Sequence, residues 1–284
     1  MRGSWLTVYA AGCLLAQSAL ADTALSQSEG GYESHAVWIP GGRFRAAVGL
    51  SSDPKKQEKD AVLKPFQMDR LPVTNADYLS FVKENPRWQK GNAPKLFVDE
   101  QYLAHWEGSL SLGANVEGEQ PVTQVSWFAA RAYCKSKGGR LPMENEWEFV
   151  AAASDAKWDA RQDPSWRKQI LDWYAKPNPA KLPKVGQSHA NLYQVFDLHG
   201  LVWEWVEDFG STMMGGDSRD TGGSDRMLFC GAAAVGAGQK NDYASFMRYA
   251  FRSSLKARYG GRNLGFRCAK DAPLNMDGAA KIGR

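Results

Sequence analysis

The sequence has little of what several common functions require. It contains 4 cysteines and 4 histidines in 284 residues, and His35, His105, His189 and His199 lack the spacing of a metal-binding helix. It has no G-x-S-x-G motif and no P-loop, so the motifs of an α/β-hydrolase and of a P-loop nucleotide-binding protein are missing. The formal net charge is only +4, which does not indicate a nucleic-acid partner. Beyond the N-terminal segment, no apolar run is long enough to cross a membrane.

Residues 1–21 predict a cleaved secretory signal peptide. Arg2 precedes an apolar run from Trp5 to Leu15, and Ala19-Leu20-Ala21 then supplies small residues at the spacing of a cleavage site. We therefore expect cleavage before Asp22 and an exported mature chain, 22–284. The alternative is a lipoprotein modified at Cys13, which leaves an unusually short apolar region.

Aromatic residues and chain-breaking residues are both abundant. The chain has 11 Trp, 10 Tyr and 12 Phe among 28 Gly and 13 Pro, and its hydrophobic content of 43% is enough for a substantial core. Long periodic segments are few, and the stretch between Asn85 and Glu119 is a poorly periodic loop region. This composition predicts a single irregular, loop-rich α+β domain held by aromatic packing, covering residues 22–284.

Three helices can be predicted from capping and spacing. Thr74 is placed to cap a helix that buries Tyr78 and its apolar neighbours. Ser126 precedes the apolar-rich run Trp127–Cys134, and a Gly-Gly pair at 138–139 supplies the left-handed conformation that ends such a helix. Another helix is expected after Met143, with three glutamates early, where the positive end of the helix dipole favours carboxylates.

The sequence motifs in these segments resemble those of a known family. The stretches V-S-W-x-x-A-x-A-Y-C and R-L-P-x-E-x-E-W-E, between Val125 and Glu148, are similar to the signature of the formylglycine-generating-enzyme (sulfatase-modifying factor) family. The helix motif V-T-N-x-x-Y-x-x-F and the ending N-x-G-F-R-C match it as well. The resemblance implies a C-type-lectin-like fold and a Cys134–Cys268 disulfide. Cys230 is then left over, either as a buried inert thiol or as a reactive one.

The copper site of the catalytically competent relatives is missing from the sequence. In those relatives a G-G-S strand precedes two cysteines that bind copper, because soft thiolates suit Cu(I). The corresponding segment here, starting at Cys230, reads C-G-A-A-A-V-G, and no further cysteine occurs before Cys268. We therefore expect no copper and no formylglycine formation. The histidine motif H-x-x-x-H-x-E of the iron-dependent sulfoxide synthases that contain this domain is absent too.

A calcium site is implied by the resemblance at G-L-V-W-E-W. The ligands transferred from the family are the Glu204 carboxylate and the backbone carbonyls of His199, Gly200 and Val202, which are the oxygen donors that a hard cation needs. Leu201 replaces the usual asparagine, so calcium and an empty, hydrogen-bonded turn both remain open. The family's other calcium site is expected to be missing, because residues 154–184 depart from its pattern.

An exported, copper-less chain of this kind is similar to the family's periplasmic pyoverdine-maturation members. That resemblance implies a periplasmic oxidoreductase that converts the dihydropyoverdine chromophore to pyoverdine. Its implied partners are the peptide siderophore precursor, ferribactin or dihydropyoverdine, and other periplasmic maturation proteins. Two alternatives stay open: a non-catalytic binding module of the same fold, and a formylglycine-generating enzyme, against which the missing cysteine pair argues.

A pocket is expected where the copper cysteines are lost. Small residues in the 232–236 segment remove volume that larger side chains fill in the family. We assign Trp205 as a stacking wall, Arg252 as an anchor for an anionic oxygen, and a tyrosine or a thiol as the proton-transfer group. The candidate pocket residues are Trp205, Cys230, Ala233, Gly236, Tyr243 and Arg252. Each of them taken singly is also compatible with simple packing.

Overall fold

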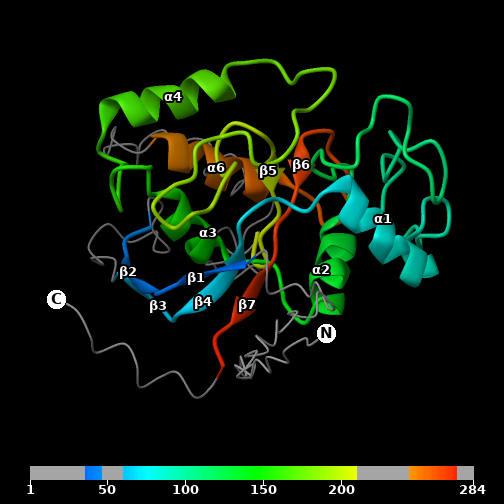
Figure 1. Cartoon of the computed structure of the whole chain (residues 1–284), viewed down its shortest axis with the longest axis horizontal. Coiled ribbons are helices and arrows are strands. Elements are labelled where there is room, and N and C mark those ends of the chain that lie inside the picture. Colours follow the sequence, from blue (N-terminus) through cyan, green and yellow to red (C-terminus); the bar gives the residue numbers. More distant parts are fainter. Residues whose placement is uncertain (1–35, 47–59, 210–242, 274–284) are drawn as a thin grey trace, which may run out of the picture. The chain divides into compact units, whose positions relative to one another are not determined.

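The computed structural model describes residues 36–46, 60–209 and 243–273 of the chain. Within these ranges short strands and helices are joined by long loops, which confirms the loop-rich α+β prediction (Figure 1). The strands are β1 (Ala36–Ile39), β2 (Gly42–Phe44), β3 (Ala61–Leu63), β4 (Phe66–Asp69), β5 (Trp203–Glu204), β6 (Leu264–Gly265) and β7 (Ala269–Asp271). The helices are α1 (Asn75–Glu84), the 3-10 turn η2 (Pro86–Trp88), α2 (Trp127–Ser136), α3 (Glu144–Ala151), α4 (Pro164–Tyr174) and α6 (Tyr243–Ser254).

Strand β4 is the centre of a three-stranded antiparallel sheet with the order β1-β4-β7 (Figure 1). Met68 in β4 pairs with Val37 of β1 on one side and with Ala269 of β7 on the other. Strands β2 and β3 form a second antiparallel pair, and β5 and β6 form a short parallel pair. The sheet therefore joins segments from the two ends of the described chain.

A turn at Gly41 separates β1 from β2. Gly41 has a φ of 72°, and a Cβ atom there would lie 2.4 Å from the Leu63 carbonyl oxygen. Only glycine fits both constraints, since a side chain would clash with backbone and would rarely adopt that φ. After this turn β2 pairs with β3, whereas β1 pairs with β4.

The predicted helices α1 and α2 begin at their expected caps. The Thr74 side chain accepts a hydrogen bond from the Asp77 N–H, and the Asp77 carboxylate accepts one from the Thr74 N–H in return, which is a capping box. Ser126 accepts from the Ala129 N–H in the same manner, and Gly138 with φ 73° follows the last turn of α2. Both predictions are confirmed.

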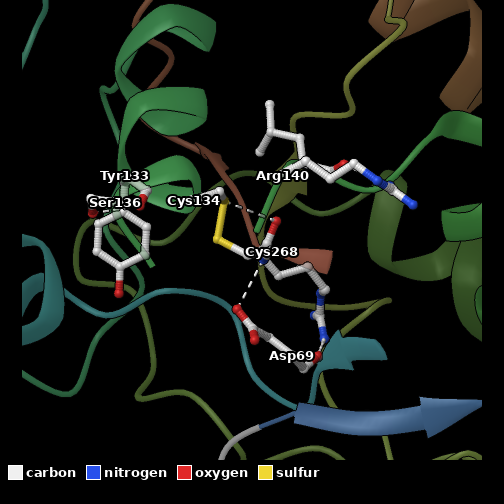
Figure 2. Close-up of a disulfide and its surroundings, with 8 residues drawn as sticks. Asp69, Tyr133, Cys134, Ser136, Arg140 and Cys268 are labelled. Atoms are coloured by element: carbon white, nitrogen blue, oxygen red, sulfur yellow. Dashed lines mark hydrogen bonds between the residues drawn. A yellow bond between two sulfur atoms is a disulfide. The ribbon is translucent and has the colours of Figure 1, made fainter. Parts of the chain in front are cut away.

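The Cys134–Cys268 disulfide predicted from the family resemblance is present. It joins the last turn of α2 to the residue before β7, across a sequence separation of 134 (Figure 2). The Cys268 N–H also donates to the Asp69 carboxylate at 2.9 Å, so the bridge is tied to the end of β4. Cys230 lies outside the described residues.

Two groups of buried apolar side chains form the core. The larger one packs the α1 and α2 helices and the 88–106 loop around the disulfide, and the smaller one packs α3 on the β1-β4-β7 sheet. Aromatic rings dominate the first group: Tyr78 packs against both Phe81 and Tyr133, as the aromatic content predicts. No helix in the described ranges combines the length and the apolar character needed to cross a bilayer.

Candidate functional site

The structure separates the candidate pocket residues that it describes. Cys230, Ala233 and Gly236 lie outside the described residues. Tyr243, at the start of α6, is 50% exposed, whereas Arg252 near the end of the same helix is 2% exposed. Positions 243 and 252 are separated by about two and a half helical turns, which places them on opposite faces of α6. They do not line one pocket together.

Trp205 is a core residue in this structure. Its side chain has no exposed surface, and the indole N–H donates to the Val125 carbonyl at 3.0 Å. The ring also packs edge-on against Phe209. A buried, hydrogen-bonded indole holds β5 against the segment before α2, so it offers no open face for stacking.

Arg252 belongs to a buried charge cluster that holds α6 on α3. Its Nη1 donates to the Glu148 carboxylate at 2.8 Å, and its guanidinium lies 4.4 Å from the centre of the Trp147 ring. Arg248 donates from Nε and Nη2 to the same carboxylate. Burial alone would raise the pKa of Glu148, but the two guanidinium groups outweigh it and lower that pKa to about 2. Glu148 therefore stays ionised as the anchor of the helix pair.

The Glu204 carboxylate makes a second buried ion pair, with Arg267. Arg267 donates from Nη2 to Oε1 at 2.7 Å and from Nε to Oε2 at 2.8 Å, and the Trp147 indole N–H donates to Oε2 at 2.6 Å. Both carboxylate oxygens are engaged, and a cation already faces them. Such an arrangement does not fit Glu204 as a calcium ligand.

The turn before β5 is held by hydrogen bonds. Gly200 has a φ of 102°, and the His199 ring bonds through Nε2 to the Ala151 carbonyl at 2.9 Å. Burial and then the charge of Arg248 lower the pKa of His199 to about 3, so its ring is neutral at pH 7. Among the described residues no cluster of three His, Cys, Asp or Glu side chains is placed to hold a metal ion. These contacts fit the hydrogen-bonded turn, and calcium binding by this segment stays a prediction.

An aromatic series leads from α4 across β5 to α6. The Trp203 ring stacks on Tyr174 with ring centres 5.0 Å apart, and on Phe251 at 4.5 Å. All three side chains are half-buried. Phe251 also lines a groove of about 360 Å³ beyond the end of α6, which we call the α6 groove. Its lining residues are Asp99, Phe251, Ser254, Leu255, Lys256, Arg258 and Tyr259.

The polar side of the α6 groove is fixed by Asp99. One carboxylate oxygen accepts from the Gly260 N–H and the other from the Gln101 N–H, both at 3.0 Å. This pins the 256–260 segment and leaves Tyr259 42% exposed at the groove. The site thus has an aromatic wall, a fixed loop and two exposed cations, Lys256 and Arg258.

Comparison with known proteins places these features in a family. The sequence profile of the sulfatase-modifying factor enzyme 1-like domain (FGE-sulfatase) matches residues 22–272. The chain belongs to this family. This formylglycine-generating-enzyme-like chain is 29% identical to the inactive C-alpha-formylglycine-generating enzyme 2 of Mus musculus, over 83% of the chain and 85% of the relative. It is also 29% identical to the formylglycine-generating enzyme of Streptomyces coelicolor, over 86% and 92%.

More distant relatives and solved structures are similar as well. The hercynine oxygenase of Mycolicibacterium smegmatis is 28% identical over 66% of this family member and 49% of the relative. The structure of PvdO from Pseudomonas aeruginosa is 16% identical, covers 84% of this chain and 94% of its own, and has a TM-score of 0.47. The crystal structure of CarF also has a TM-score of 0.47, with 16% identity and coverage of 84% and 98%.

Several motif residues of this family member hold its fold together. Glu148, from R-L-P-x-E-x-E-W-E, anchors α6, while Arg267 and Cys268, from the N-x-G-F-R-C ending, pair with Glu204 and Cys134. Sequence reasoning missed the α6 groove. Two of its lining residues, Leu255 and Tyr259, lie beyond the end of α6, so helical spacing in the sequence gives no signal for it.

Proposed function

We propose that this chain is an exported, copper-free member of its family that matures a peptide siderophore by oxidising the dihydropyoverdine chromophore to pyoverdine. The observation that carries the proposal is in the C-terminal third. The family's ending is complete there, while C-G-A-A-A-V-G replaces the segment before the copper cysteines and no cysteine lies between Gly231 and Arg267. A protein with the family fold but without the copper-binding cysteine pair must use chemistry that does not depend on copper.

The α6 groove supports a flat, conjugated substrate. Its volume of about 360 Å³ lies at the small end of the range for pockets that take organic ligands, about 300 to 1,000 Å³. Phe251 and Tyr259 supply aromatic faces for stacking, and Lys256 supplies a cation for an anionic catechol-type oxygen. The open mouth leaves room for the attached peptide.

The proposed reaction removes two electrons and two protons from the dihydro chromophore. Molecular oxygen accepts both electrons and both protons, giving hydrogen peroxide and the aromatic product. The conjugation gained by the product provides the driving force, so the protein has to orient the substrate and assist proton removal. We place this reaction in the periplasm, after removal of a signal peptide at residues 1–21, with ferribactin or dihydropyoverdine and other maturation proteins as partners.

The experiment is a comparison of chromophore oxidation with and without the protein. Purified mature protein is incubated with dihydropyoverdine under air and under argon, while absorbance, fluorescence and peroxide are followed. We expect acceleration under air only, with one peroxide formed for each chromophore. Tyr259→Ala should slow the reaction at least about fivefold, because a stacking contact contributes on the order of 1 kcal/mol. Trp158→Ala, which removes a 60% exposed aromatic residue elsewhere, is the matched control and should not.

A second candidate function is binding without catalysis. Two observations favour it: relatives of 29% and 30% identity are named inactive C-alpha-formylglycine-generating enzyme 2, and no histidine, cysteine or glutamate is among the described residues that line the α6 groove. Equal oxidation rates with and without protein, together with saturable quenching of the chromophore, would establish this function instead.

A further inference from the structure

A second and larger cavity, of about 500 Å³, lies next to the 259–262 segment, which we call the His105 cavity. Tyr259 lines the α6 groove, whereas Arg262 lines the His105 cavity, so the same short segment contributes to both. The other walls come from the 104–105, 113–116, 120–124 and 178–182 segments. Nothing in the proposed oxidation uses this cavity.

The His105 imidazole is an unpartnered polar group in the wall. Both ring nitrogens are shielded from solvent, and neither has a hydrogen-bond partner among the described residues. Leaving a buried polar atom without a partner costs about 1–3 kcal/mol. Burial lowers the pKa of His105 to about 4. The nearby Gln124 amide opposes this shift, and the positive charges of Lys90 and Arg262 add to it. At pH 7 the ring is therefore neutral, with one donor and one acceptor to offer.

The cavity has one cation that no described group neutralises. Arg262 is exposed and lines the cavity, and no described side chain forms an ion pair with it. Lys181 also lines the cavity, but it is paired with Glu117. A guanidinium beside a neutral imidazole can bind a single carboxylate, because the planar guanidinium donates to both carboxylate oxygens.

The backbone at the cavity wall and next to it is held in a conformation that most residues avoid. Leu103 and Gln124 have φ values of 48° and 55°, and the Leu103 N–H donates to the Gln124 carbonyl at 2.9 Å. A Cβ atom at Gly113 would lie 2.5 Å from the His105 carbonyl oxygen, so the wall requires glycine there. Backbone strain of this kind persists where the surrounding structure holds the residues in place, and it is found most often at ligand-binding sites.

We propose that the His105 cavity binds a small organic carboxylate. Arg262 holds the carboxylate, and the His105 ring, turned about its side-chain bonds, gains the hydrogen-bond partner it lacks. The non-polar part of the ligand packs on the aliphatic wall of Ala114, Val116, Pro179 and Leu182. An inorganic anion would leave most of the 500 Å³ empty, which is why an organic ligand is favoured.

The test uses proton NMR of the histidine rings in the full mature protein. 4-Phenylbutyrate is titrated as the probe, with 4-phenylbutyramide as its uncharged counterpart and inorganic phosphate as a bare anion. His105→Gln identifies the His105 signal. We expect a saturable shift of that signal with the carboxylate, binding of the amide that is at least about tenfold weaker, and no competition by equimolar phosphate.

Variants separate the cavity from the rest of the surface. Arg262→Ala should weaken carboxylate binding about tenfold or more, whereas Arg43→Ala, which removes an exposed arginine on β2, should leave it unchanged. Equal affinity for carboxylate and amide in the unmodified protein would overturn the proposal without any variant. So would phosphate displacing the probe, or a His105 signal that never moves. The outcome does not depend on whether the chain oxidises a chromophore.

Discussion

Replacing Glu204 by glutamine tests whether the buried pair with Arg267 holds the closing segment of the fold. Both side chains have no exposed surface, and the substitution keeps the shape of the side chain while removing its charge. Removing one partner of a buried ion pair costs about 3–5 kcal/mol, because the other charge is left without compensation. Arg267 keeps contacts to the carbonyls of Asp69 and Phe196, at 3.1 and 2.9 Å, so we expect the lower end, about 3 kcal/mol.

The assay is equilibrium unfolding in urea with the disulfide intact. With a slope of about 3 kcal/mol per molar urea for a domain of this size, the midpoint should fall by about 1 M. Asp172→Asn breaks an exposed pair with Lys168 and is the control, with an expected change under about 0.5 kcal/mol. A Glu204→Gln midpoint equal to that of the unmodified protein would refute the reasoning. A midpoint that falls on chelation of calcium in the unmodified protein, but not in Glu204→Gln, would show that a metal ion stabilises this carboxylate.

Four further predictions concern single groups. Reducing the Cys134–Cys268 bridge should cost up to about 5 kcal/mol in the chain-entropy model, and thiol counting by mass spectrometry should find Cys230 free. Copper loading should leave no tightly held copper by metal analysis, since no second cysteine follows Cys230 before the bridged one. Ala233→Trp tests the pocket that the sequence predicts at the 232–236 segment: it should abolish chromophore maturation while leaving the thermal midpoint nearly unchanged if that pocket holds the chromophore, whereas normal maturation would leave the α6 groove as the site. The unfolded chain protonates His199 near pH 6.5 and the folded one near pH 3, so at pH 5 this group should lower stability by about 2 kcal/mol relative to pH 7.5, and His199→Gln should remove that loss.

Helices α1, α2 and α3 were predicted from local sequence signals, whereas α4 and α6 were missed. Thr74 and Ser126 mark the starts of α1 and α2 because their side chains satisfy local N–H groups. Helix α4 was missed although Asp163 followed by Pro164 is a local start signal, which the irregular Trp- and Lys-rich composition of the segment obscured. Helix α6 depends on Arg248 meeting Glu148 across the fold, and no local pattern contains that information.

The candidate site could be predicted only in part, for the same reason. Matching residues to a motif gives their identity, and it does not give the partner that each side chain finds. Arg252 was expected to anchor a substrate, whereas the structure pairs it with Glu148; Trp205 was expected to form a wall, and it lies in the core. The open aromatic surface belongs to Phe251 and Tyr259, whose exposure follows from where α6 ends.

The position of β4 between β1 and β7 has a consequence for biogenesis. The ribosome delivers the chain from its N-terminus, so α2 is available long before β6 and β7 exist. Until then the Glu204 carboxylate lacks its ion-pair partner Arg267, and the edge of β4 that pairs with β7 is unpaired. In an oxidising compartment, Cys230 emerges before Cys268 and has the first opportunity to pair with the waiting thiol. For the exported chain that we propose, we therefore expect disulfide isomerisation as a late step, completed only when the last strand is available.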